Sequence, residues 1–188
     1  MNRRNFLSTS LATSSIPFIV KKQSPNEDKK IRLGFIGVGL RGRNHLQQAL
    51  YRSDVEIPAV CDIDPNSIAE ANKLFKKFGK KEPIAYMNGE RDFENYVKRE
   101  DLDGIIISTP WEWHVPMAVA AMKAGKYAGV EVSATVTLQE SWDLIDTYEK
   151  TGSHCMILEN VCYRRDIMSV LNMVRKNMFG EMLYGHCG

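Results

Sequence analysis

The stretch IRLGFIGVGLRG, residues 31–42, decides the fold. A mostly apolar run, typical of a buried strand, leads into the pattern G-x-G-x-x-G formed by Gly37, Gly39 and Gly42. The first glycine permits a tight turn, the second leaves room for a pyrophosphate, and the third lets a helix pack closely on the strand. A helical pattern follows at about 43–52, so phosphates would lie at a helix N-terminus. The stretch therefore predicts the start of a dinucleotide-binding unit.

Downstream of this stretch, short apolar runs alternate with helical patterns. The alternation predicts parallel strands joined by helical crossovers, and near-continuous apolar strands are typical of a sheet covered on both faces. The predicted fold class is α/β, a doubly wound parallel sheet of the Rossmann type. The expected strands are 31–37, 55–62, 83–87, 104–109, 127–132 and 154–160, and the expected helices are 43–52, 65–78, 91–99, 115–124, 138–150 and 165–178.

Asp62 ends the second predicted strand, twenty residues after Gly42. A carboxylate at this position can accept hydrogen bonds from ribose hydroxyls and would repel a 2′-phosphate, which favours NAD over NADP. Arg41 and Arg43 weaken this preference, because either could bind the extra phosphate. The alternative is a glycine-rich turn and a surface aspartate that bind nothing.

Further candidate residues follow later strands, because ligands gather at the carboxyl ends of the strands in a doubly wound sheet. Trp111 and Trp113 flank Glu112 and would form either a lid over a flat ligand or an ordinary packed loop. His114 is either part of the site or a helix-start residue without chemistry. Asn160 ends the last predicted strand.

Glu131 lies in an apolar run, and no Lys or Arg occurs between Lys126 and Lys150. The carboxylate therefore has no partner nearby in the sequence, and we expect it to be unpaired.

The charge of the chain is unevenly spread. Formal net charge is +2, but residues 1–30 carry six Lys/Arg against two Asp/Glu, so the remainder is slightly acidic and offers no basic surface for nucleic acid. Arg3 and Arg4, followed by a weakly apolar stretch to Val20, resemble a twin-arginine export signal, and the stretch is too short for a transmembrane helix. We expect export to the periplasm; a basic tail on a cytoplasmic protein is the alternative.

The four cysteines show no C-x-x-C spacing, so no metal site is expected and small buried thiols are the better interpretation. We divide the chain into a leader and linker at 1–30, a dinucleotide-binding domain at 31–158 and the beginning of a second domain at 159–188. The strand-like EMLYGHC at 181–187 cannot be stable as a single strand, so we expect the sequence to be an N-terminal fragment.

Together the glycine motif, Asp62, T-P-x-x-x-H at Thr109–His114 and A-G-K at 124–126 resemble the Gfo/Idh/MocA family of oxidoreductases. The resemblance implies bound NAD, a sugar or polyol substrate, and a second α/β domain that carries most of the sugar site and favours homo-oligomers. Where the family has Glu-Lys-Pro, this sequence has Glu131-Val132-Ser133. The family's lysine supplies positive charge and helps to move a proton, which valine cannot do. Either the protein is not an ordinary dehydrogenase, or another residue substitutes.

The phrases GLRGRNH, STPWEWH, GVEVS and LENVCYRRD are similar to glycoside hydrolase family 109, whose named activity is α-N-acetylgalactosaminidase. That likeness implies hydrolysis with captive NAD: transient oxidation at sugar carbon 3, elimination, water addition and re-reduction. It also implies that Tyr163 is an acid or base near the sugar, although Tyr163 could equally pack as a helix-start aromatic. By position it assigns cofactor contacts to Leu40, Arg41, Asp62, Trp111, Glu112, Trp113, His114, Glu131, Val132 and Asn160.

Two alternatives stay open. One is a sugar or polyol oxidoreductase with net turnover of NAD, and the other is an NAD-binding chain without activity. Most substrate contacts of the family lie in the second domain, so we expect the 188 residues alone to be inactive, and an incomplete sheet would favour aggregation.

Overall fold

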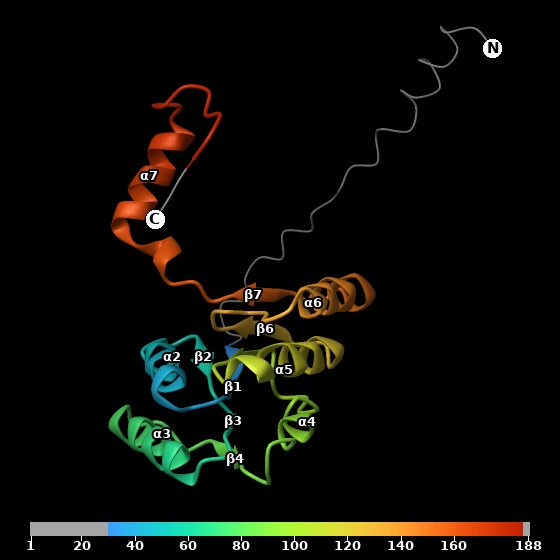
Figure 1. Cartoon of the computed structure of the whole chain (residues 1–188). Coiled ribbons are helices and arrows are strands. Elements are labelled where there is room, and N and C mark those ends of the chain that lie inside the picture. The colour runs from blue at the N-terminus through green and yellow to red at the C-terminus, as the bar shows by residue number, and fades with distance from the viewer. Residues whose placement is uncertain (1–29, 186–188) are drawn as a thin grey trace, which may run out of the picture.

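The computed structural model describes residues 30–185, which form a parallel sheet with helices on both faces (Figure 1). The predicted α/β class is thereby confirmed. The strands are β1 (Ile31–Ile36), β2 (Val55–Glu56), β3 (Ala59–Cys61), β4 (Ile84–Tyr86), β5 (Gly104–Ile107), β6 (Tyr127–Val130) and β7 (Cys155–Ile157). The helices are α2 (Leu40–Leu50), α3 (Pro65–Lys77), α4 (Phe93–Tyr96), α5 (Trp111–Lys123), α6 (Leu138–Thr151), the 3₁₀ turn η1 (Val161–Tyr163) and α7 (Arg165–Arg175).

The strand order is β4-β3-β1-β5-β6-β7, with β2 beside the first residues of β1, and every pairing is parallel. The chain runs outward from β1 in one direction and then returns to continue from β5 in the other. The order therefore reverses between β1 and β5, and the carboxyl ends of these two strands flank the place where ligands bind in such sheets.

Two apolar cores lie on opposite faces of the sheet. Helices α2 and α3 cover one face, where Leu46 and Phe75 pack against Phe35. Helices α4, α5 and α6 cover the other, where Met122 packs near Ile107 (Figure 1). Because both faces are buried, the strands need near-continuous apolar sequence, which is the pattern that predicted them.

The predicted strand 55–62 is interrupted at Ile57 and Pro58, because a proline cannot donate a ladder hydrogen bond. The hydroxyl of Tyr96 fills the gap. It accepts the Phe35 N–H at 2.8 Å and donates to the Ala59 carbonyl at 2.8 Å. A buried side chain from α4 thus completes the pairing of β1 with β3.

The helix boundaries agree with the capping signals in part. Asp64 accepts hydrogen bonds from the first N–H groups of α3, with Pro65 as its first residue, and Gly125 ends α5 with φ of 74°, as predicted. Helix α5 begins at Trp111, however, four residues before the predicted start. The predicted Trp-rich loop is therefore the first turn of a helix.

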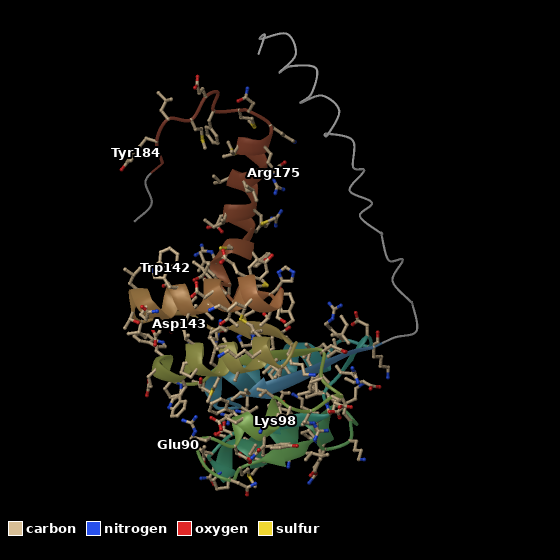
Figure 2. All side chains as sticks on the ribbon, turned by 90° about the vertical axis from the view of Figure 1, so that its right-hand side faces the viewer. Glu90, Lys98, Trp142, Asp143, Arg175 and Tyr184 are labelled. Carbon is tan, nitrogen blue, oxygen red and sulfur yellow. The ribbon has the colours of Figure 1, made fainter. Side chains whose placement is uncertain are left out.

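The C-terminal part extends away from the sheet, as α7 does in Figure 1 and as Arg175 and Tyr184 do in Figure 2. No residue of α7 is buried. The strand predicted at 181–187 is wrong for residues 181–185, which form none. An unpaired segment gains no ladder hydrogen bonds from an extended conformation.

The predicted export leader lies outside the described residues. Between residues 30 and 185, none of the helices combines the length and apolarity needed to cross a bilayer.

Candidate functional site

The glycine turn between β1 and α2 has two crowded positions and one open position. A Cβ on Gly37, whose φ is 80°, would lie 2.6 Å from the Ser108 carbonyl oxygen, and one on Gly42 would lie 1.9 Å from the Gly37 carbonyl oxygen. A Cβ on Gly39 would meet nothing within 4 Å. The fold itself thus requires the first and third glycines, whereas the second borders free space.

The N-terminus of α2 opens onto that same space. Gly39 is its N-cap residue, no side chain caps the helix, and no acidic residue occupies its first turn. Leu40, its first residue, is 79% exposed. Uncapped N–H groups and the positive end of the helix dipole favour an anionic ligand at this position.

Asp62 follows β3 and contacts the glycine turn directly. Its Oδ2 accepts the Val38 N–H at 2.7 Å and its Oδ1 accepts the Asp64 N–H at 2.9 Å. Each oxygen keeps a further lone pair for a ligand hydroxyl. The spacing predicted that the Asp62 carboxylate binds a ligand. It did not predict that the same carboxylate also holds the glycine turn in place.

A cavity of about 250 Å³ lies between the glycine turn, Asp62 and the connection from β5 to α5. The buried hydroxyl of Ser108 borders it and has no hydrogen-bond partner in the structure. An open glycine, an uncapped helix, an orphaned hydroxyl and a flat apolar wall together fit a dinucleotide. The apolar wall is formed by Ile63, Phe93, Pro110, Trp113 and Met117.

The two tryptophans do not line the cavity together. Trp113 lines the cavity and packs edge-to-face on Phe93, with ring centroids 5.9 Å apart. Trp111 is 60% exposed, and Glu112 is exposed as well. Residues two apart on a helix face different directions, so Trp111 does not line the cavity with Trp113, and the lid over a flat ligand stays a hypothesis.

His114 is a buried clamp. Its Nδ1 lies 2.7 Å from the Ser133 carbonyl oxygen and its Nε2 lies 2.8 Å from the Thr109 carbonyl oxygen. Both partners are acceptors, and a neutral imidazole donates from one nitrogen only, so His114 donates to the connection after β5 or to the one after β6. The assignment of His114 as a cofactor contact stays a prediction.

Glu131, expected to be unpaired, is paired. It directly follows β6 with its side chain 8% exposed, and its Oε1 accepts from Arg41 Nε at 2.7 Å and from His45 Nε2. Burial alone would raise the pKa of Glu131, but the hydrogen bonds from His45 and Arg41 outweigh it and hold the pKa below its ordinary value. Both partners lie on α2, far away in the sequence, and His45 was missed as a site residue.

Of the remaining candidate residues, one lies at a second, polar hollow. Asn160 begins η1 and lines a space of about 340 Å³ opposite Arg41 and His45. Val132 is 39% exposed beside Glu131. Tyr163 is 68% exposed and lines neither this hollow nor the cavity at the glycine turn. The structure thus does not connect Tyr163 with the other candidate residues.

The cysteines are only partly buried. Burial raises the pKa of Cys61 to about 12 and that of half-buried Cys155 to about 11. Cys162 is exposed, so the expectation of buried thiols is wrong for it, and Cys187 lies outside the described residues. Within the described part of the chain, no three His, Cys, Asp or Glu side chains are grouped so as to hold a metal ion.

Two family models match the chain. Residues 31–159 match Gfo/Idh/MocA, described as an oxidoreductase family with an NAD-binding Rossmann fold. Residues 163–188 match the C-terminal domain of glycosyl hydrolase 109. These matches confirm both resemblances that the sequence motifs indicated.

Curated relatives carry corresponding names. The chain is 53% identical over 169 residues to a glycosyl hydrolase family 109 protein of Parabacteroides distasonis, covering 89% of this chain and 36% of the relative. It is 52% identical to an alpha-N-acetylgalactosaminidase of Tannerella forsythia, with the same coverage. The chain thus spans little more than a third of the length of these relatives.

Solved structures share the fold. Scyllo-inositol dehydrogenase from Lactobacillus casei, determined with bound NAD(H) and scyllo-inositol, superposes with a TM-score of 0.69 at 18% identity, over 81% of this chain and 43% of that one. An NAD-binding protein from Listeria innocua reaches 0.64 at 26% identity, over 82% and 42%.

Proposed function

The chain belongs to the Gfo/Idh/MocA oxidoreductase family with an NAD-binding Rossmann fold, and from this premise we propose that it is the NAD-binding part of a glycosidase of the α-N-acetylgalactosaminidase type. The observation that carries the proposal is Val132, which follows the buried Glu131 where ordinary dehydrogenases of the family have lysine. The likeness to relatives named as family 109 glycosidases supports it.

The residues of the cavity would hold NAD in a defined direction. The glycine turn and the start of α2 would bind the pyrophosphate, Asp62 the adenosine ribose hydroxyls, and the wall beside Trp113 the adenine ring. The nicotinamide half would then lie toward Glu131 and Val132. Ser108 would gain the hydrogen-bond partner that it lacks.

The same contacts favour NAD over NADP. Asp62 would repel a 2′-phosphate. Arg41, which the sequence left open as a phosphate ligand, has its Nε committed to Glu131 at 2.7 Å. The Arg41 guanidinium therefore points toward Glu131 after β6, and away from Asp62, where the 2′-phosphate of NADP would lie.

Bound NAD would supply a reversible two-electron oxidation of a sugar carbon, so that hydrolysis proceeds without net consumption of the cofactor. The described residues would bind and orient the dinucleotide, and the apolar wall, with Phe93 buried and Trp113 half-buried, would exclude water from its adenine end. Val132 has no proton to give or take, so proton transfer to the sugar requires other groups.

A second candidate is a sugar or polyol oxidoreductase. The observation in its favour is that Arg41 and His45 bring N–H donors to Glu131, the residue that precedes the missing lysine. This function requires that reduced cofactor leaves the protein in every cycle.

The test uses the protein encoded by the complete reading frame. It is given an aryl α-N-acetylgalactosaminide without added nicotinamide, while aryl alcohol release and the absorbance of reduced cofactor are followed. Many turnovers without build-up of NADH are expected. Steady formation of NADH from free sugars when NAD is added, without glycoside cleavage, would instead support the oxidoreductase. NAD binding without either reaction would indicate an NAD-binding protein that has no activity.

We also propose that residues 1–30 direct export by the twin-arginine route, because a protein with a captive cofactor must be folded before it crosses the membrane. Replacing both Arg3 and Arg4 by Lys should retain the protein in the cytoplasm. The matched control is the replacement of Lys21 and Lys22 by Arg, which keeps the charge and leaves the arginine pair intact. Normal export of the Arg3 and Arg4 variant would contradict the proposal.

A further inference from the structure

Two side chains from consecutive turns of α2 converge on one oxygen of Glu131. Arg41 and His45 are four residues apart and therefore lie on the same face of the helix. Arg41 Nε is 2.7 Å from Oε1, and His45 Nε2 contacts the same atom. Among the described residues, the second oxygen, Oε2, accepts one hydrogen bond, from the Val132 N–H at 3.3 Å. The carboxylate is therefore held by one oxygen and keeps acceptor capacity on the other.

The burial of Glu131 makes these contacts necessary. A carboxylate that is 8% exposed loses most of its hydration and must receive hydrogen bonds from the protein. Arg41 is 44% exposed and can be hydrated instead, whereas His45, at 26%, lies closer to the interior. His45 is thus the more buried of the two donors.

The surroundings of His45 contain few other charges. Glu131, which follows β6, contacts its Nε2, and Arg41, from its own helix, is the one other charged group among the described residues that line the hollow. The other residues that line the polar hollow are neutral amides, namely Asn44, Gln47, Gln48 and Asn160. Its interaction with Glu131 is therefore the main polar contact of the imidazole within the described part of the chain.

We propose that His45 is a positioning residue for the nicotinamide half of the dinucleotide. By donating from Nε2 to Glu131, it fixes the connection Glu131-Val132-Ser133 at the carboxyl end of β6, where that half would bind. Its action is indirect, through Glu131, and does not extend to the adenosine half, which lies at Asp62 on the other side of the glycine turn. The inference rests on the dinucleotide site proposed above.

The experiment compares NAD with ADP-ribose, which lacks the nicotinamide ring. Binding of each ligand to the full chain is measured by titration calorimetry for the wild type, His45→Leu and His45→Gln. His45→Leu should weaken NAD binding on the order of tenfold, because the connection that receives the nicotinamide half would no longer be held in place before binding, and it should leave ADP-ribose binding unchanged. His45→Gln, whose amide can donate from nearly the same place, should restore NAD binding.

A matched control is Gln48→Leu, which removes a polar side chain from the same face of α2 and the same hollow without touching Glu131. It should change neither affinity. Equal weakening of both ligands by His45→Leu would indicate damage to the fold, and it would overturn the inference, as would failure of glutamine to restore NAD binding. A wild type that binds neither ligand would refute the dinucleotide site itself and this inference with it.

Discussion

The third glycine of the motif lies so close to the first that a Cβ on Gly42 would be 1.9 Å from the carbonyl oxygen of Gly37. Atoms at such a distance overlap, and the nearest atom is backbone, so it cannot rotate away. The contact joins the start of α2 to the end of β1. The N-terminus of α2 can therefore lie next to the ligand site only because residue 42 is a glycine.

Gly42→Ala should therefore impair folding, whereas Gly39→Ala should impair NAD binding. Gly42→Ala should unfold or strongly destabilise the chain, because the turn must open. Gly39 has a φ of −63° and free space around its Cβ position, so Gly39→Ala should fold normally but bind NAD weakly, since the methyl group would enter the pyrophosphate space. Circular dichroism and titration calorimetry measure the two effects. A Gly39→Ala protein with wild-type NAD affinity would contradict the proposed position of the pyrophosphate.

Asp62→Ala should lower the affinities for NAD and for ADP-ribose to the same extent, by about tenfold to a hundredfold, because both ligands contain the adenosine ribose. Part of the loss would come from the Val38 N–H, which also bonds to Asp62. The control is Asp64→Ala, which removes the cap of α3 and should lower thermal stability without changing affinity. Unchanged affinity of Asp62→Ala for both ligands would refute the assignment of this carboxylate.

Tyr96→Phe should lower the free energy of unfolding by about 1–3 kcal/mol, because the Phe35 N–H and the Ala59 carbonyl would both lose their buried partner. Urea denaturation measures the change as a shift of the midpoint at constant slope. Tyr86→Phe is the matched control, since its half-buried hydroxyl accepts only one 3.2 Å bond from Arg99. A loss no larger than that of the control would show that Tyr96 does not bridge the strands.

The parts of the site that could be predicted are those encoded locally. Gly37, Gly42 and Asp62 stand at fixed distances from one another along one strand-turn-helix-strand unit, and each has a physical reason for its residue type. The alternation of apolar runs with helical patterns likewise identified the parallel sheet, because burial on both faces leaves a clear mark on strand composition.

The parts that could not be predicted depend on contacts between distant segments. Glu131 looked unpaired because its partners are 86 and 90 residues earlier, on a helix whose rotation the sequence does not reveal. Tyr96 carries no local sign that it bridges two strands. Pro58, in contrast, was a visible reason to expect the break between β2 and β3. The early start of α5 had no such signal, because Pro110 precedes the helix as its N-cap residue and Pro116 lies inside it.

Glu131 should make the stability of the protein depend on acid pH. Its pKa is below the ordinary value in the folded state, so the folded protein binds this proton less readily than the unfolded chain does. The contribution is fully present above the unfolded pKa, about 4.3, and is lost as the pH falls through the lower folded pKa. Glu131→Gln should therefore show a constant difference in stability near neutral pH that shrinks below about pH 4.3.

This comparison is made between the wild type and Glu131→Gln, which both keep His45 and Arg41, because hydrogen bonds from both side chains hold the pKa of Glu131 below its ordinary value. Other carboxylates are common to both and cancel, and Arg41 keeps its charge throughout. Urea denaturation at a series of pH values gives the two free energies of unfolding. A difference that grows as the pH falls would mean that the folded protein favours the protonated acid, and that the hydrogen bonds from His45 and Arg41 do not outweigh the burial of the carboxylate.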